Sequence, residues 1–387
     1  MDADSVALLT TPAGTDALAL AAEQRDPSGL SAAQALRARF PADLAAAALT
    51  QAGLRRKAVA KFGARAASMF FTPAGLEQAT RPDVAAHHAA RLRAAGVTEV
   101  VDLGCGIGSD ALAFADHGLD VTGVERDPTT AAVARFNLAP RGRVRTGDAE
   151  RLADELLAPT TGAFCDPARR TSAGRSWKVE DFTPPWTFVL RLLNRAGPAG
   201  VKLGPALPHA LIPESAEAEW VSSHGDTVEV ALWAGLGAQP GVRAAMVLPG
   251  RRLVVPERIP ELEVGALGGY LYEPNGAVIR AGGVTTVGQQ LQGRLLDSHI
   301  AYLSSDQLSE TPFATAFAVV EQLPFREKVI RRWLREHRIG VLEIKKRGVD
   351  LDPAQLRKQL ALRGDEHATL ILTRTAAGAI AVIARRV

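Results

Sequence analysis

Short apolar runs alternate with amphipathic helical stretches through the middle of the chain. Such alternation is typical of a parallel sheet that is covered by helices on both faces. We expect strands, in chain order, at 97–103, 120–125, 144–146, 162–165 and 200–203. The helices expected between them lie at 109–117, 128–137 and 186–194. Two further apolar runs, at 227–234 and 243–248, predict an antiparallel pair that completes a doubly wound α/β sheet of seven strands.

The regions on either side of this sheet have other patterns. The N-terminal region is alanine-rich and reads as helical, with Pro41 at the start of one helix and a break at 69–73. After the sheet, Pro256 and Pro260 indicate a linker. The last segment alternates helix and strand and ends in a hairpin. We therefore divide the chain into a helical region 1–83, a sheet domain 84–255, a small connecting α+β domain 256–315 and a compact α/β module 316–387.

Composition excludes several classes of protein. The chain has 387 residues, of which 47% are hydrophobic and 22% charged, as in ordinary globular proteins. No uncharged apolar run approaches the ~20 residues of a membrane span. The first residues include Asp2 and Asp4 and do not resemble a signal peptide. Two cysteines, Cys105 and Cys165, cannot form a disulfide framework or a four-cysteine zinc site. We expect a cytoplasmic protein without a metal.

The net charge of +3 conceals an asymmetry along the chain. Residues 324–387 contain 15 Lys and Arg against 7 Asp and Glu, a net charge of +8, which leaves −5 for the remainder. A basic terminal block on a mildly acidic body indicates a polyanionic partner. An ordinary solvated helix face is the alternative explanation.

The strand at 97–103 runs into a glycine-rich turn. Gly104, Gly106 and Gly108 allow the backbone to bend sharply and a ligand to approach, and a helix begins near Ser109. A dinucleotide-binding turn requires glycine or alanine where Ser109 stands. Asp102, which precedes the first glycine, would also repel a pyrophosphate. The turn therefore favours a cationic nucleoside such as S-adenosylmethionine over NAD.

Acidic residues stand at the ends of three successive expected strands. Asp102 lies beside the glycine turn, Glu125 ends the second strand and Asp148 follows the third. Ligands bind beyond the carboxyl ends of such strands, where Glu125 can take ribose hydroxyls. Asp148 can accept from an adenine amino group. Each of the three alone could be an exposed loop carboxylate, but their order favours a shared pocket.

Together, the turn 102–108, Gly123-Val124-Glu125, Gly147-Asp148-Ala149 and Asp166-Pro167 resemble the motif series of class I S-adenosylmethionine-dependent methyltransferases. The resemblance covers about residues 84–255 and implies a Rossmann-like sheet of seven strands. The cofactor-binding residues that it implies are Asp102, Gly104, Gly106, Gly108, Ser109, Glu125, Arg126, Asp148 and Ala149.

The flanks resemble a bacterial group of methyltransferases that end in a THUMP-like domain. This second resemblance rests on the segment 69–80 (MFFTPAGLEQAT) and on the basic C-terminal module. Because THUMP domains bind RNA, it implies an RNA substrate. Basic residues that grip phosphates are then expected in the module. They are Arg331, Arg335, Lys345, Lys346 and Arg347.

The sequence that follows the fourth strand, Asp166-Pro167-Ala168-Arg169-Arg170, resembles the catalytic loop of amino-methylating members. In those enzymes Asp or Asn, two prolines and an aromatic residue orient the target nitrogen, and positioning supplies most of the rate. Ala168 and Arg169 depart from that pattern. Base stacking would therefore fall to Trp177, Trp186, Arg169 or Arg170. The expected catalytic residues are Asp166, Pro167 and Arg169.

Other chemistry is less well supported. C5-methylation of pyrimidines requires a nucleophilic cysteine, whereas Cys105 and Cys165 are expected to be core residues. His87 and His88 are expected on an exposed helix face, and no cluster has metal-ligand spacing. The prediction is an S-adenosylmethionine-dependent methyltransferase that acts on a base nitrogen of structured RNA, such as tRNA or rRNA. The alternatives are a small-molecule or protein substrate, or a non-catalytic RNA-binding protein with the same fold.

Overall fold

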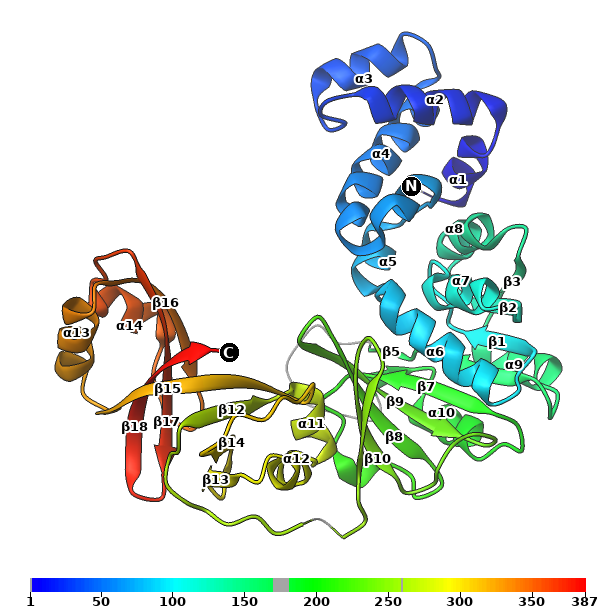
Figure 1. Ribbon diagram of the computed structural model, residues 1–387. Coiled ribbons are helices and arrows are strands. Elements are labelled where there is room, and N and C mark those ends of the chain that lie inside the picture. Colours follow the sequence, from blue (N-terminus) through cyan, green and yellow to red (C-terminus); the bar gives the residue numbers. More distant parts are fainter. Residues whose placement is uncertain (1, 170–180, 259) are drawn as a thin grey trace. The chain divides into compact units, whose positions relative to one another are not determined.

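The computed structural model describes residues 2–169, 181–258 and 260–387 (Figure 1). The chain forms two compact units. The first consists of Met1–Ala218 and Glu229–Gly241, and the second consists of Glu219–Val228 and Val242–Val387. The boundaries between the units at 218/219 and 228/229 therefore fall within two neighbouring strands, Glu217–Ser223 and Asp226–Ala234.

The first unit begins with helices, as the alanine-rich sequence predicts. Two of these helices start with a threonine cap followed by proline, because Thr11 and Thr72 accept hydrogen bonds from Gly14 and Gly75. In order, the helices are α1 (Ala3–Leu9), α2 (Pro12–Glu23), α3 (Leu30–Arg37), α4 (Ala42–Phe62), the 3₁₀ helix η1 (Gly63–Ser68), α5 (Pro73–Gln78) and α6 (Pro82–Ala94).

The expected parallel sheet follows these helices, and each expected strand is present. The strands are β1 (Glu99–Leu103), β2 (Asp120–Glu125), β3 (Gly142–Thr146), β4 (Gly162–Cys165) and β7 (Ala199–Leu203), with all neighbouring pairs parallel. The helices that alternate with them are α7 (Ser109–Asp116), α8 (Pro128–Leu138), α9 (Ala149–Leu156) and α10 (Trp186–Leu193).

The antiparallel end of the sheet differs from the expectation. The strands there are β8 (Glu217–Ser223), β9 (Asp226–Ala234), β10 (Arg243–Val247) and β11 (Arg251–Val255). The sheet order is β11-β10-β8-β9-β7-β4-β1-β2-β3, so the predicted pairing of 227–234 with 243–248 is wrong. Strand β8, which was not predicted, lies between β9 and β10, and with β10 and β11 the sheet has nine strands.

Strand β8 was not predicted from the sequence because it contains charged residues. Glu217 and Glu219 are almost fully buried in this strand. Arg91 donates to Glu217 at 2.8 Å, and Arg252 donates to Glu219 at 2.9 Å. Buried carboxylates are tolerated when they are paired in this way, so a strand with a polar pattern can still be interior.

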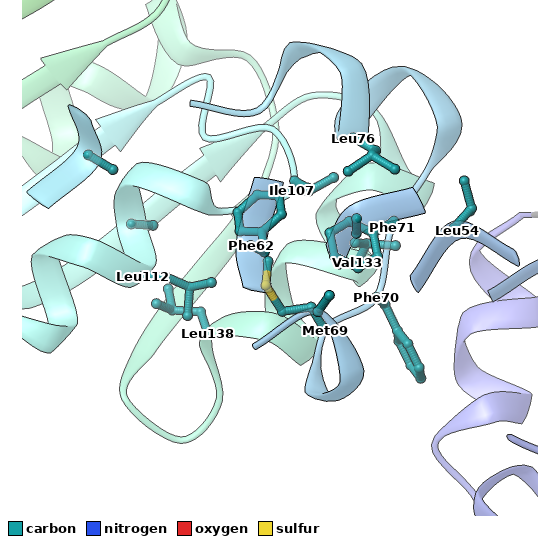
Figure 2. Close-up of a cluster of buried hydrophobic side chains, with 14 of the residues drawn as sticks. Leu54, Phe62, Met69, Phe70, Phe71, Leu76, Ile107, Leu112, Val133 and Leu138 are labelled. Carbon is teal, nitrogen blue, oxygen red and sulfur yellow. The ribbon is translucent and has the colours of Figure 1, made fainter. Parts of the chain in front are cut away.

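The N-terminal helices share a hydrophobic core with helices α7 and α8 of the sheet layer. Figure 2 shows Phe62, Met69 and Phe71 among side chains from the glycine turn, α7 and α8. Asn137 accepts from the Phe70 amide at 2.7 Å and donates to the Phe70 and Ile107 carbonyl oxygens at 3.0 and 2.9 Å. This core and these hydrogen bonds fix the segment before α5 against the glycine turn.

The second unit contains a mixed sheet of seven strands in the order β13-β14-β12-β15-β18-β17-β16. The predicted terminal hairpin is confirmed, since β17 and β18 pair antiparallel. The strands are β12 (Tyr270–Pro274), β13 (Arg294–Asp297), β14 (Ile300–Ser305), β15 (Ala314–Pro324), β16 (Ile339–Lys346), β17 (Glu366–Thr375) and β18 (Gly378–Arg386). Its helices are α11 (Gly276–Ala281), α12 (Val284–Gln290), α13 (Glu327–Glu336) and α14 (Pro353–Leu360).

Within the described residues, no single helix has both the length and the apolar character needed to cross a membrane. Helices α1 and α2 satisfy that test only when taken together, and they are bent by 88°.

Candidate active site

A cavity of about 730 Å³ lies in the first unit, at the carboxyl ends of the parallel strands. Its volume falls within the range of small-molecule and cofactor sites. The three carboxylates predicted to share a pocket, Asp102, Glu125 and Asp148, all line it. The other predicted site residues that line it are Gly104, Gly106, Ser109, Arg126, Ala149, Asp166 and Pro167.

The glycine turn has the conformation that its sequence requires. Gly104, Gly106 and Gly108 have φ angles of 91°, 55° and 86°, where side chains are strained. A Cβ atom at Gly106 would meet no protein atom within 4 Å, because the residue borders the open cavity. Gly108 does not line the cavity and instead forms the N-terminal cap of α7. The turn thus leaves space above it for a ligand.

The carboxylates at the strand ends have different surroundings. Glu125 accepts hydrogen bonds from the amides of Gly106 and Asp127 at 3.1 and 2.8 Å, and Asp148 caps α9. Asp102 is 2% exposed, and one of its oxygens has no hydrogen-bond partner among the described residues. Burial raises the pKa of Asp102 well above its usual value. An unpaired buried carboxylate beside a cavity fits a ligand with a positive charge.

One wall of the cavity comes from the segment that precedes the sheet, which sequence reasoning did not assign to the site. Thr72, Gly75 and Thr80 all line the cavity. A Cβ atom at Gly75 would lie 2.3 Å from Ile107 Cγ2, so only glycine allows α5 to pack this closely against the turn. The Ser109 hydroxyl donates to the Thr80 carbonyl oxygen at 2.8 Å. The resemblance over 69–80 was the available signal for this wall.

Asp166 lies after β4 and forms an ion pair with Lys202 of β7. Both residues line the cavity, with side-chain exposures of 36% and 15%. Burial raises the pKa of Asp166, and the Lys202 ammonium partly opposes this effect. Burial alone would lower the pKa of Lys202, but Asp166, Asp110 and Glu229 together raise it. Lys202 was missed in the sequence, although a lone lysine in the apolar strand 199–203 is a signal for a buried partner.

His88 corrects another expectation, because it is fully buried rather than exposed. Its Nδ1 lies 2.8 Å from Asp110 Oδ1, and its Nε2 lies 2.6 Å from Glu229 Oε1. Burial alone would lower the pKa of His88, but Glu229 and Asp110 outweigh this and raise it to about 10. The imidazole is therefore a cation at neutral pH that joins α6, α7 and β9. The Thr80 hydroxyl donates to the second oxygen of Asp110.

Among the described residues, these pairs leave Asp102 as the buried carboxylate of the cavity lining without an ion pair. His88 forms ion pairs with Asp110 and Glu229, and Lys202 forms one with Asp166. No ion pair of Asp102 occurs within the described ranges. An unpaired buried charge is costly, so a cationic ligand gains from this arrangement.

The remaining predictions for the acceptor side have mixed outcomes. Cys105 and Cys165 are buried, and burial raises the pKa of both thiols, as expected for core residues rather than nucleophiles. Trp186 lies beside Phe182, with ring centroids 6.0 Å apart, and does not line the cavity. The predictions for the Arg169 side chain, Arg170 and Trp177 lie outside the described part of the structure. Ala168, Thr183 and Pro184 complete this side of the cavity.

The predicted RNA-binding residues lie on β16, after it and on α13 of the second unit. Lys345 donates to Glu273 at 2.6 Å, and Arg347 lies 3.9 Å from the same carboxylate. Lys346 is exposed and donates to the Leu351 carbonyl oxygen at 2.5 Å. The two remaining residues lie on α13, where Arg331 pairs with Glu327 and Arg335 is exposed. Among the described residues, no group of His, Cys, Asp and Glu could hold a metal ion.

Known protein families match three parts of the chain. A methyltransferase domain matches residues 101–157, a THUMP-like domain matches 314–386, and a domain of unknown function matches 2–58. The crystal structure of a candidate methyltransferase from Porphyromonas gingivalis W83 has the same fold. It superposes with a TM-score of 0.77 at 23% identity, over 96% of this chain and 98% of the other. The fold and cavity thus define a Rossmann-like methyltransferase.

Two relatives from Mycobacterium tuberculosis make the assignment narrower. The proteins of strains CDC 1551 and H37Rv are each 34% identical to this chain over 339 residues. The match covers 84% of this chain and 92% of each relative. Both are described as uncharacterized S-adenosylmethionine-dependent methyltransferases. The chain belongs to the S-adenosylmethionine-dependent methyltransferases, and S-adenosylmethionine is its cofactor.

Proposed function

We propose that the protein methylates a base nitrogen of structured RNA, such as tRNA or rRNA. The observation that carries the proposal is a single cavity that contains both the unpaired Asp102 and the Asp166 carboxylate. A carboxylate in the cavity with no nucleophilic cysteine beside it suits transfer to an amine better than transfer to carbon. The cytoplasm is the compartment that an RNA substrate of this kind implies.

The residues present fit the cofactor. Asp102 would hold its positively charged amino group, Glu125 its ribose hydroxyls and Asp148 its adenine, above the glycine turn. When bound, S-adenosylmethionine supplies a methyl group on a cationic sulfur that leaves as a neutral thioether when the carbon–sulfur bond breaks. Asp166 accepts a hydrogen bond from the target amine and directs the nitrogen lone pair. The nitrogen loses one proton as its bond to the methyl carbon forms, and Asp166 is the nearby acceptor.

The RNA part of the proposal is supported by the second unit. Helices α13 and α14 bury Ile330, Trp333 and Leu356 against the sheet. Their other faces are basic and exposed, with cations spaced along α13 at intervals of three and four residues. These cations are Lys328, Arg332 and Arg335 on α13, and Arg357 and Lys358 on α14. Such a surface, within the match to a THUMP-like domain, suits phosphate binding.

The test uses methyl-labelled S-adenosylmethionine and total RNA from cells of the source organism that lack the gene for this protein. We expect labelled RNA with wild-type protein, and no label with Asp166→Ala even though its affinity for S-adenosylmethionine is nearly unchanged. Nucleoside analysis then identifies the product. Label only in protein or small-molecule fractions would contradict the RNA substrate, and unchanged turnover by Asp166→Ala would contradict the role of Asp166.

Charge-reversal variants test the RNA surface. We expect the double variant Lys328→Glu, Arg335→Glu to bind the same RNA at least tenfold more weakly, with a smaller dependence of affinity on salt, since about two phosphate contacts are removed. Arg143→Glu is the matched control, because Arg143 is an exposed cation of the first unit that pairs with Asp120. Equal affinities of the double variant and the wild-type protein would contradict binding by α13.

A further inference from the structure

Two carboxylates of the same cavity differ in whether the protein supplies a cation. Asp102 is buried and has an oxygen without a partner among the described residues. The Lys202 ammonium instead donates a hydrogen bond to Asp166 Oδ2. A buried carboxyl group without a partner tends to be neutral, whereas an adjacent cation keeps it ionised. Among the described residues, the carboxylate on the acceptor side of the cavity is therefore paired with a cation, and the buried carboxylate on the cofactor side is not.

We propose that Lys202 is a positioning residue for methyl transfer, which holds Asp166 as a carboxylate with one oxygen fixed and the other directed to the acceptor. The proposal rests on the proposed role of Asp166 at the methyl acceptor. A carboxylate accepts hydrogen bonds from an amine and leaves the nitrogen lone pair available for the methyl group. A protonated Asp166 would donate its proton to that lone pair and would block attack.

The neighbouring charges leave Lys202 available for this task. The groups that interact electrostatically with Asp166 come from four elements and one strand end. They are Asp102 of β1, Asp110 of α7, Glu229 of β9, Lys202 of β7 and the thiol of Cys165. His88 bridges Asp110 and Glu229 at 2.8 and 2.6 Å, and the Lys202 ammonium contacts Asp166.

The local fold also restricts the position of the Lys202 side chain. Lys202 lies in β7, which pairs with β4 on one side and with β9 on the other. Its side chain is 15% exposed, so few rotamers are open to it. Asp166 follows directly after β4, where Cys165 pairs with Val201, the neighbour of Lys202. Adjacent strands thus bring the two groups together at one sheet edge.

The test combines a titration with kinetics. Infrared difference spectra, assigned with Asp166→Asn, report protonation of the Asp166 carboxyl in the protein alone. We expect Lys202→Met to move this titration to higher pH by at least one pH unit, and Lys202→Arg to leave it close to wild type. Lys57→Met, at an exposed lysine of α4, is the control. A titration that does not move in Lys202→Met would overturn the proposal.

The kinetic arm uses the RNA and the labelled cofactor described above. We expect Lys202→Met to lower kcat at least tenfold at neutral pH, to shift the acidic limb of the pH–rate profile upward and to leave S-adenosylmethionine affinity within threefold. In the Asp166→Asn background, the same change should have little further effect. A merely structural role would lower activity without moving the profile. If Lys202→Met does not fold, Lys202→Gln provides the same comparison.

Failure of the two proposals can be told apart. If wild-type protein labels no RNA, the proposed function fails, while the infrared titration still decides whether Lys202 controls Asp166. If RNA is labelled and the pH–rate profile of Lys202→Met equals that of wild type, the assignment of Lys202 fails alone.

Discussion

Replacement of His88 by glutamine should destabilise the first unit strongly, and the loss should depend on pH. The side chain is fully buried and bridges Asp110 and Glu229. Glutamine retains hydrogen-bonding groups of similar size but carries no charge. The two buried carboxylates, Asp110 and Glu229, would then lack the cation that lies between them. Breaking a buried ion pair on one side commonly costs about 3–5 kcal/mol.

The structure gives a similar magnitude. The pKa of His88 rises from 6.5 to about 10 in the folded protein, so protonation favours the folded state. At roughly 1.4 kcal/mol per pKa unit, the contribution is about 4 kcal/mol at pH 7 and about 1 kcal/mol at pH 9. It is complete below the unfolded pKa of 6.5 and is lost as the pH rises through about 10.

The assay is equilibrium urea unfolding at pH 7 and pH 9, followed by hydrogen–deuterium exchange in peptides from α6 and β9. This readout assigns the transition to the unit that contains His88. His87→Gln is the control, since His87 is the adjacent residue and is only half-buried. A loss for His88→Gln that is equal at both pH values would show that the imidazole is not a cation, and this would refute the reasoning.

Three further predictions concern the cavity and the hydrogen bonds that hold the segment before α5 against the glycine turn. Asp102→Asn should raise the midpoint of thermal unfolding of the free protein, since burial disfavours the Asp102 carboxylate. Calorimetry should find that the affinity of the wild-type protein for S-adenosylmethionine rises with pH, and the substitution should remove this rise. Asn137→Ala should cost about 3 kcal/mol in urea unfolding, because it leaves the Phe70 amide and two carbonyl groups unpaired; a loss below about 1 kcal/mol would contradict this. Gly106→Ala should weaken S-adenosylmethionine binding at least tenfold and cost only about 1–2 kcal/mol of stability from its φ of 55°, and unchanged binding would place the ligand elsewhere.

Features that depend only on residues close together in the sequence could be predicted from it. The glycine turn, the carboxylates at strand ends and the alternating strands and helices are local patterns, and the structure places them as expected. Strand β8 could not be found in this way, because its polarity is offset by distant arginines. The same limit applied to the pairing at the antiparallel end of the sheet.

The charged network of the cavity depends on residues that are far apart in the sequence. His88 lies 22 residues from Asp110 and 141 from Glu229, so its helix pattern alone could not reveal its burial. Lys202 and Asp166 are 36 residues apart and meet because β7 pairs with β4. Sequence patterns can thus locate residues that line this cavity, whereas the pairing of its charges requires the fold.

The central claim is that the cavity at the strand ends holds S-adenosylmethionine through its carboxylates. A crystal structure of the protein with S-adenosylmethionine tests this most directly. We expect the amino group of the ligand beside the unpaired oxygen of Asp102, its ribose hydroxyls on Glu125 and its methyl group facing Asp166. A ligand bound at another place, or one that leaves Asp102 without a partner, would contradict the account.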